Sequence, residues 1–273
     1  MYKGKTIGII SLKGGVGKTS SVANIGAIIS YEFKKKVLMV DANFSAPNLG
    51  LHLGLVEPKT TIHDVLLNRA AVNDAIHRHE AGFHVIVGAY VSRRVNPERL
   101  NQKIGCLREL YDLIIIDSSP NLNGEILATM MASDELLVVT TPDYPTLSTT
   151  LRAIRLAKQR RTPITGIILN RVRSKNFELG ISDIEEAAQV PVLSVLPEDI
   201  NVAAAIASTT PVALHAPKSS ASIEYKKLAA CLIGESYNDP RLWPKLKSLL
   251  FRNMTKDTVN RALLQNERKQ AGI

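Results

Sequence analysis

The chain has 273 residues, of which 45% are hydrophobic and 22% charged; this composition fits one large α/β domain or two small ones and excludes global disorder. No run approaches the ~18 apolar residues that a membrane-spanning helix needs, and two cysteines, Cys106 and Cys231, are too few and too far apart for a disulfide framework or a cysteine-based metal site. The net charge of +9 favours an anionic partner, and the scarcity of cysteine favours a reducing cytoplasm.

Short apolar segments recur along the first 200 residues without strict alternation, which is typical of strands buried on both faces of a parallel sheet. Helical patterns lie between them, among them Asn96–Leu110, Thr146–Gln159 and Ser182–Gln189, the last with a capping box formed by Ser182 and Glu185. This alternation predicts an α/β domain with a doubly wound, mostly parallel sheet that binds ligands at the carboxyl ends of its strands. We expect strands at Lys5–Leu12, Lys36–Asp41, Phe83–Gly88, Tyr111–Asp117, Glu135–Thr141, Ile164–Asn170 and Val190–Leu196.

The first strand leads directly into a glycine-rich loop, and a helical pattern follows the loop. Glycines allow the backbone to fold closely around phosphates, and the start of the helix adds its positive dipole end. Lys18 is expected to reach the β- and γ-phosphates, and the Thr19 hydroxyl is expected to complete a Mg²⁺ shell. The sequence therefore predicts a nucleotide-phosphate site at Lys13, Gly14, Gly15, Val16, Gly17, Lys18, Thr19 and Ser20.

Lys13 adds a second lysine at the start of this loop, and the resulting KGGVGKT resembles the deviant Walker A motif of the MinD/ParA family of ATPases. The resemblance implies a P-loop NTPase fold with ATP and Mg²⁺ as cofactors. It also implies a homodimer that forms on ATP binding, in which Lys13 reaches the phosphates bound by the partner. A cation in that position would stabilise the charge on the transferring phosphoryl group.

Two further motifs of the family follow in order. Asp41, after the second predicted strand, lies in a stretch similar to the family's switch I, and Asp117 ends a strand as the family's Walker B aspartate does. The resemblance implies that Thr19, Asp41 and Asp117 serve the metal, in part through bound waters. Where the family commonly has a second aspartate for the attacking water, this chain has Asn43, which orients water but accepts no proton. We therefore expect slow basal hydrolysis, with Lys13, Lys18, Asp41 and Asn43 as the catalytic set.

The base of the nucleotide has its own expected contacts. Asn170, at the end of a strand, matches the family's base-contacting asparagine, and its amide can donate and accept at an adenine edge. An asparagine that ends a strand and begins a turn remains the alternative interpretation of this residue. By resemblance, Arg171 beside it and the segment Pro197, Glu198 and Asp199 complete the nucleotide-binding residues. Within the family, MinD-like sequences, archaeal ones especially, are the most similar around Pro47–Leu51 and Thr61–Leu66.

A turn-rich stretch, Ser236–Pro240, separates a predicted ATPase domain at 1–238 from a basic helical tail at 239–273. From Arg241 to Ile273 eight basic and two acidic residues give +6, which leaves +3 for the first 240 residues. Helical periodicity gathers the apolar side chains of 242–254 on one face with cations mostly opposite, as interfacial membrane helices require. The predicted membrane-binding residues are Trp243, Lys245, Leu246, Lys247, Leu249, Leu250, Phe251 and Arg252.

This tail leaves three interpretations open. It binds an anionic membrane, it docks on the body or on a second copy, or it binds nucleic acid or a protein partner. By resemblance we expect a cytoplasmic, MinD-like ATPase that attaches peripherally to the inner face of the cell membrane, answers to an activating protein partner and serves spatial positioning such as division-site placement. The alternatives are a ParA-like partitioning ATPase that binds DNA nonspecifically and a nucleotide-gated adaptor with little hydrolysis.

Overall fold

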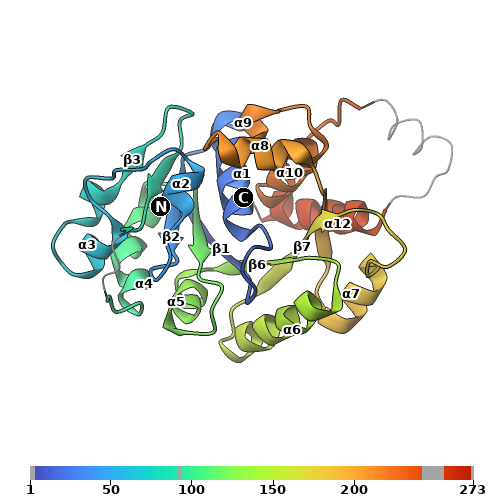
Figure 1. Cartoon of the computed structure of the whole chain (residues 1–273), viewed down its shortest axis with the longest axis horizontal. Helices are drawn as coiled ribbons and strands as arrows, with labels where there is room; N and C mark the ends of the chain where they lie inside the picture. Colours follow the sequence, from blue (N-terminus) through green and yellow to red (C-terminus); the bar gives the residue numbers. More distant parts are fainter. Residues whose placement is uncertain (1–3, 91–93, 242–254, 272–273) are drawn as a thin grey trace.

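The computed structural model describes residues 4–90, 94–241 and 255–271, and the structural statements below concern those residues. Their eight-stranded sheet has the order β3-β4-β2-β5-β1-β6-β7-β8, and every neighbouring pair is parallel except β3 and β4. The sheet confirms the predicted doubly wound, mostly parallel fold (Figure 1). Its strands are β1 (Lys5–Ile10), β2 (Val37–Ala42), β3 (His77–Arg78), β4 (His84–Ile86), β5 (Leu113–Ser118), β6 (Glu135–Thr140), β7 (Ile164–Val172) and β8 (Val192–Pro197).

Helices cover both faces of this sheet (Figure 1). One face packs against α1 (Lys18–Tyr31), α2 (Leu49–His52), α8 (Ile200–Ala207), α9 (Val212–His215), α10 (Ser220–Leu232) and α12 (Lys256–Gln270). The other face packs against α3 (Ile62–Leu66), η1 (Val72–Ala75), α4 (Arg99–Ile104), η2 (Gly105–Glu109), α5 (Gly124–Ala132), α6 (Tyr144–Gln159) and α7 (Ile181–Ala188). Burial of apolar side chains on both faces explains why the strand sequences show no alternation.

All seven predicted strands are present, and the added strand β3 is a two-residue antiparallel edge too short to leave a pattern. Two helix predictions were wrong in detail. The segment predicted as one helix over Asn96–Leu110 contains α4 and then the 3-10 turn η2, which begins at Gly105, a residue that disfavours an α-helix interior. The helix α7 is not capped by Ser182: its N-cap is Gly180, whose N–H donates to Asp183 over 3.1 Å.

The C-terminal helix α12 packs beside β8 and α10, on the same face as α1. Arg268 donates to Glu135 on β6 over 2.6 Å, and Lys5 on β1 lies 2.9 Å from the same carboxylate. Arg261 donates to the Leu193 carbonyl over 2.7 Å. The polar segment after Met254 is therefore docked on the body, as one of the three interpretations of the tail expected.

The predicted amphipathic helix of 242–254, with all its predicted membrane-binding residues, lies outside the described residues. On its N-terminal side the chain is fastened by Arg241, which donates to Asp239 over 2.9 Å and also contacts Glu224 on α10. None of the helices in the described ranges combines the length and apolarity that crossing a bilayer requires.

The strand order places a topological switch point at β1, which has β5 and β2 on one side and β6 on the other. Ligands of doubly wound folds bind at the carboxyl ends of the strands beside such a point. The glycine-rich loop leaves β1 at this point. The strand order therefore places residues 11–20 where a ligand is expected to bind.

Candidate functional site

The loop between β1 and α1 depends on glycine for its shape. Gly17, the N-cap of α1, has φ +96°, and a Cβ on it would lie 2.1 Å from the Asn170 side-chain nitrogen. Gly15 also has a positive φ, +75°, and neither Gly14 nor Gly15 would meet another atom within 4 Å through a Cβ. The loop is therefore tightly packed where it enters α1 and open on its outer side, where backbone amides can approach an anion.

Lys18 and Thr19, the first residues of α1, converge on one carboxylate. The Lys18 ammonium lies 2.9 Å from Oδ1 of Asp117 at the end of β5, and the Thr19 hydroxyl donates to Oδ2 over 2.7 Å. The same hydroxyl lies 3.0 Å from the side-chain oxygen of Asn48. Since the Lys18 and Asp117 side chains are both buried, breaking this pair by removing one partner is strongly destabilising.

Asp41 lies on the neighbouring strand, directly opposite Asp117 in the register of β2 and β5. Its carboxylate accepts three backbone N–H groups at 3.0 Å, from Asn43, Asn48 and Leu49. Burial and the neighbouring charge of Asp117 nevertheless raise the pKa of Asp41 to about 7. The sheet register thus holds two carboxylates together at a cost that a bound cation would relieve.

Mg²⁺ fits this donor set. The predicted metal residues Thr19, Asp41 and Asp117 come together, and Asn48 adds a carboxamide oxygen. All four offer hard oxygen atoms, and Mg²⁺ typically takes one or two protein oxygens and keeps several waters beside a nucleotide phosphate. The described residues contain no cluster of three or more His, Cys, Asp or Glu side chains that could hold a metal, and this site has two carboxylates beside its hydroxyl and carboxamide oxygens.

Asn43, predicted to orient the attacking water, is buried beside Asp41 and lines the cavity over the loop. Its side-chain nitrogen donates to the Ala46 carbonyl over 2.5 Å, which fixes the orientation of the amide. Its side-chain oxygen finds no hydrogen-bond partner among the described residues. Asn43 therefore has a fixed amide whose buried oxygen has no hydrogen-bond partner among the described residues, in a residue that lines the cavity.

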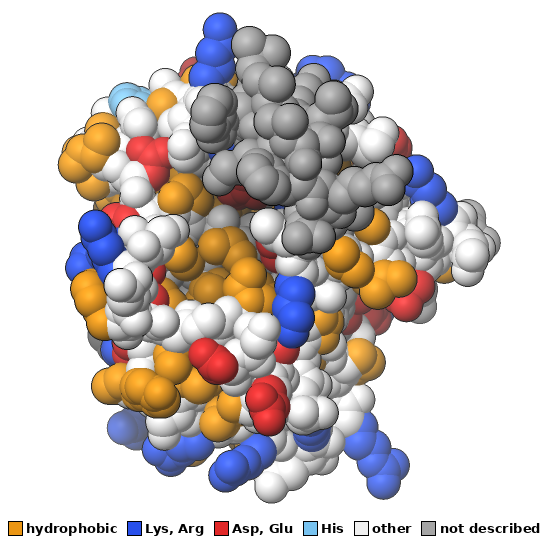
Figure 2. Space-filling model, turned by 90° about the vertical axis from the view of Figure 1, so that its right-hand side faces the viewer, with side chains coloured by type: hydrophobic (Ala, Val, Ile, Leu, Met, Phe, Trp, Pro, Cys, Tyr) orange, Lys and Arg blue, Asp and Glu red, His pale blue; other side chains and the backbone are white. Residues whose placement is uncertain are grey.

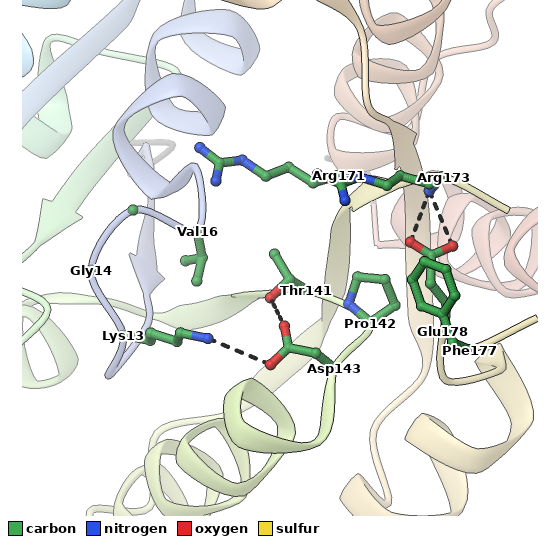
Figure 3. A pocket seen from close by; sticks show the side chains of 11 residues that line it. Lys13, Gly14, Val16, Thr141, Pro142, Asp143, Arg171, Arg173, Phe177 and Glu178 are labelled. Carbon is green, nitrogen blue, oxygen red and sulfur yellow. Dashed lines mark hydrogen bonds and ion pairs between the residues drawn. The ribbon is translucent and has the colours of Figure 1, made fainter. Parts of the chain in front are cut away.

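Lys13 extends toward the start of α6. Its ammonium donates to the Thr146 hydroxyl over 2.5 Å and lies 3.5 Å from Asp143, the N-cap of α6 (Figure 3). Partial burial alone would raise the pKa of Asp143, but hydrogen bonds from Thr141 and Thr146 and the charge of Lys13 hold it below its usual value. Lys13 is thus held by a charged acceptor while its side chain remains 42% exposed.

Two cavities flank the glycine loop. One, of about 210 Å³, extends from Lys18 and Thr19 past Asn43 and Pro120 to Ile206 on α8. The other, of about 310 Å³, lies between Lys13 and the segments after β6 and β7, with the exposed Phe177 at its rim (Figure 3). The first has the lysine, hydroxyl and open glycine amides that a nucleotide phosphate requires.

Asn170, predicted to contact the base, and Arg171, predicted to bind the nucleotide, both lie beside the glycine loop, and their nucleotide contacts stay predictions. The Asn170 amide nitrogen donates to the Val16 carbonyl over 2.7 Å, so it braces the glycine loop. Arg171 is exposed, lines both cavities and extends from β7 toward the loop (Figure 3). Its φ of +58° is unusual for a non-glycine residue, and such strain concentrates at ligand sites.

The segment after β8 is held by contacts within the chain. Pro197 ends β8 opposite Val172, and the Glu198 carboxylate pairs with Arg173, whose Nη2 donates over 2.9 Å; this bond lowers the pKa of Glu198. Asp199 caps α8 by accepting the Asn201 N–H over 2.9 Å. Neither cavity includes these three residues, so their nucleotide contacts stay predictions.

The structure adds residues to the site that the motifs did not single out. Asn48 reaches Thr19, and His52, whose pKa is lowered by burial, lines the same cavity. Asn48 follows Asp41 by seven residues, in the loop that leaves β2, so its polarity was a usable signal. Asp143 and Thr146 carry the ordinary signature of a helix N-cap, and nothing in the sequence relates them to Lys13.

The comparisons with known proteins agree with this geometry. The family profile of the CobQ/CobB/MinD/ParA nucleotide binding domain matches residues 7–212. An uncharacterized ATP-binding protein of Methanocaldococcus jannaschii is 37% identical over 234 residues, which cover 85% of this chain and 88% of that protein.

Two solved structures are similar over most of the chain. The cell division ATPase MinD of Pyrococcus furiosus has a TM-score of 0.79 and 32% identity, and the match covers 83% of this chain and 97% of that one. The septum site-determining protein MinD of Pyrococcus horikoshii, solved in complex with Mg-ADP, has a TM-score of 0.79 and 30% identity, with 84% and 95% covered.

Proposed function

The chain belongs to the CobQ/CobB/MinD/ParA family of nucleotide-binding proteins, and from this premise we propose that it is a MinD-like ATPase that positions a partner or process at a membrane. It is an ATPase with ATP and Mg²⁺ as cofactors. The observation that carries the proposal is the convergence of Lys18 and Thr19 on Asp117 beneath an open glycine loop.

The chain's own residues act on ATP mainly by positioning and electrostatics. Bound Mg²⁺ neutralises charge on the β- and γ-phosphates. With nucleotide bound, Lys18 would pair with the phosphates in place of Asp117, and Thr19, Asp41 and Asp117 would hold the cation, in part through waters. Asn43 offers its free oxygen to the attacking water, which it orients without taking its proton, so basal hydrolysis is slow.

Lys13 links hydrolysis to dimer formation. In one subunit its ammonium is held by Thr146 and Asp143, whereas Lys18 pairs with Asp117. We propose that ATP brings two copies together and that Lys13 leaves these acceptors for the phosphates of the partner. A cation added there stabilises the charge that develops during transfer, as an arginine finger does.

Membrane attachment is assigned to the segment 242–254 and follows from dimer formation. One short amphipathic helix binds weakly, and two in one dimer gain avidity through effective concentration. We therefore propose that attachment is ATP-dependent and peripheral, at the inner face of the cell membrane. An activating protein partner then promotes ATP hydrolysis and release from the membrane. Residues 1–238 would form the ATPase unit and 239–273 the tail, although α12 packs against the body.

Cosedimentation of the full chain with vesicles of 30% phosphatidylglycerol in phosphatidylcholine tests the proposal. The bound fraction is compared between Mg-ATP and Mg-ADP. We expect at least fivefold more binding in ATP, and loss of that binding in a Leu249→Glu/Leu250→Glu variant, because the apolar face is removed. The matched control is Val259→Glu/Leu263→Glu, which alters two exposed apolar residues of α12. Equal binding in ATP and ADP, or equal loss in both variants, would refute the proposed anchor.

A further inference from the structure

The ring of His63, on α3, is fully buried and contacts two backbone segments. Its Nδ1 accepts the Ala89 N–H over 3.0 Å, and its Nε2 lies 3.0 Å from the Phe44 carbonyl oxygen. A backbone N–H can only donate, so Nδ1 carries no proton and the neutral ring has its proton on Nε2, which donates to Phe44. One imidazole tautomer therefore ties the two segments together.

These two segments follow neighbouring strands. The strands β2 and β4 run parallel, and their register ends at the pair Val40 and Ile86. Phe44 lies in the loop after β2 and Ala89 lies shortly after β4, so both are at the carboxyl edge of the sheet, where the glycine loop also lies. Beyond the last strand pair, the His63 ring connects the two chains through hydrogen bonds that the sheet itself no longer supplies.

The loop of residues 43–48 is organised around Asp41. The Asp41 carboxylate accepts the N–H groups of Asn43 and Asn48 over 3.0 Å, at the two ends of this loop. Between them, the Phe44 side chain is 3% exposed, and its ring meets the His63 ring edge-on with 5.9 Å between the centroids. Phe44 is thus the buried anchor of the loop, and His63 contacts it through both its ring and its carbonyl.

The start of α3 places the His63 ring. Thr61 is the N-cap of this helix, and the Thr61 N–H donates to the Asp64 carboxylate over 3.0 Å in a capping box. The next N–H, that of Ile62, donates to the Val87 carbonyl over 2.9 Å. These bonds fasten the beginning of the helix to the segment that follows β4, so the ring extends from a support that is itself held to the sheet.

Histidine is specifically suited to this position. Its two nitrogens lie on different sides of a flat ring, so one accepts from Ala89 while the other donates to Phe44. A phenylalanine would fill a similar space but leave both backbone groups buried without these partners, which is unfavourable. Packing alone therefore does not explain this residue, and one of its two bonds ends on the loop that carries Asn43.

We propose that His63 is a positioning residue for ATP hydrolysis: its bond to the Phe44 carbonyl holds the loop 43–48 so that Asn43 keeps its place at the phosphate cavity. This role rests on the proposed function, in which Asn43 orients the attacking water. Hydrolysis depends steeply on geometry, since a displacement of about 1 Å can cost about 100-fold in rate. Lys18 and the glycine loop belong to a different segment, so nucleotide affinity should change little.

His63 is remote from the tail of the chain. Figure 1 shows α3 at the left of the molecule, and Figure 2 looks onto the opposite side, where α12 lies. The effect of His63 is therefore measurable on the full chain in solution, without vesicles.

Two amide variants separate the two hydrogen bonds of His63. The amide nitrogen of His63→Gln lies as far from the backbone as Nε2 does and can still donate to Phe44. The amide oxygen of His63→Asn lies as far from the backbone as Nδ1 does and can still accept from Ala89. Each variant loses one bond, so a purely structural histidine predicts similar rates for both.

The measurement is single-turnover phosphate release by the full chain at saturating Mg-ATP, with nucleotide affinity measured in parallel. We expect His63→Asn to be roughly tenfold slower than the parent and His63→Gln to stay within about threefold, with the Kd for Mg-ATP within about twofold for both. The matched control is His77→Gln. The His77 Nε2 lies 2.8 Å from the Thr60 carbonyl, which is not part of the loop 43–48, so its rate should equal that of the parent.

Equal rates for His63→Gln and His63→Asn would overturn the proposal, as would a slower rate explained by weaker Mg-ATP binding. Asn43→Ala, measured beside them, distinguishes the two proposals. If it is slow and the His63 variants are equal, His63 alone loses its role, whereas a parent-like Asn43→Ala removes the role of Asn43 and with it that of His63. Nuclear magnetic resonance of the parent imidazole needs no variant to fold: we expect a proton on Nε2 alone, and a proton on Nδ1 would also overturn the proposal.

Discussion

At the scale of single residues, the proposal of slow hydrolysis depends on Asn43, which stands where the resemblance to the family leads us to expect an aspartate. Asn43 lines the phosphate cavity, its amide nitrogen donates to the Ala46 carbonyl, and its amide oxygen is buried without a hydrogen-bond partner among the described residues. An amide oxygen holds a water but cannot accept its proton, whereas a carboxylate does both. The proposed slow hydrolysis therefore follows from an amide at position 43 in place of a carboxylate.

Replacing Asn43 by aspartate tests this directly. We expect Asn43→Asp to raise the single-turnover rate of phosphate release at least tenfold, because general base catalysis contributes roughly 10²- to 10⁴-fold where it operates. Asn43→Ala is the control and is expected to be slower than the parent, since it orients no water. An Asn43→Asp rate no higher than that of the parent, in a protein that still binds Mg-ATP, would contradict the role given to this residue.

Individual site residues were predictable where spacing fixes them and unpredictable where packing decides. Lys18, Thr19 and Asp117 meet because a glycine loop and the end of a neighbouring parallel strand must lie at the same edge of the sheet. The Asn170 amide, in contrast, donates to the Val16 carbonyl. This contact requires the Gly17 backbone to lie close to the Asn170 side chain, which only a residue without a Cβ allows. No sequence pattern encodes that contact.

At the scale of elements, strands were more predictable than helix ends. A strand such as β5 is buried along its whole length, so its sequence is a continuous apolar run that is easily recognised. The start of α7 depends instead on a single hydrogen bond, from the N–H of Gly180 to the carboxylate of Asp183. The role of α12 was left open by the sequence because its contacts are distant. Arg268 meets Glu135, which lies 133 residues earlier in the chain.

The docking of α12 can be measured through Cys231, which it covers. Burial raises the pKa of the Cys231 thiol to about 12, and the thiol donates to the Arg261 carbonyl. In a Cys106→Ser background, which removes the exposed thiol, we expect Cys231 to react slowly with a disulfide reagent. Adding Arg268→Gln should raise that rate at least tenfold, because a buried carboxylate loses one of its two cations and α12 opens more often.

Lys269→Gln serves as the matched control for that measurement, since Lys269 is the exposed neighbour of Arg268 and its loss should leave the rate unchanged. Denatured samples of all variants must show one reactive thiol. Equal rates for the Arg268 and Lys269 variants would show that the Glu135 contact does not fasten α12.

For the whole molecule, the distribution of charge differs from what segment totals indicate. The first 240 residues carry +3, but the ten residues 152–161 alone carry +5, so the remainder of that body is slightly negative. In the tail, Arg241, Lys256 and Arg268 are paired with carboxylates of the body. Among the described residues, these three tail cations are thus paired with the body, whereas the five cations of 152–161 form no ion pair.

Nucleotide binding should stabilise the whole fold through the same Lys18 cluster. A ligand at one hundred times its Kd contributes about 2.7 kcal/mol, which for a chain of this size corresponds to a rise in Tm of roughly 5–11 °C. We expect that rise with Mg²⁺ and a slowly hydrolysed ATP analogue, and most of it should vanish on chelation of the metal. Differential scanning fluorimetry measures it, with Lys18→Gln as the control that should show no rise; an equal rise in that variant would contradict the assigned site.

The side-chain contacts at β8 have a consequence for solubility. This strand ends the sheet, and an open edge invites pairing with the edge of another chain. Here the N–H of Val192 is taken by Glu185 of α7, and its carbonyl by Asn260 of α12. The opposite edge is β3, only two residues long. The helix α12 thus also guards against aggregation, and its removal would expose a template on which strands of other molecules could assemble.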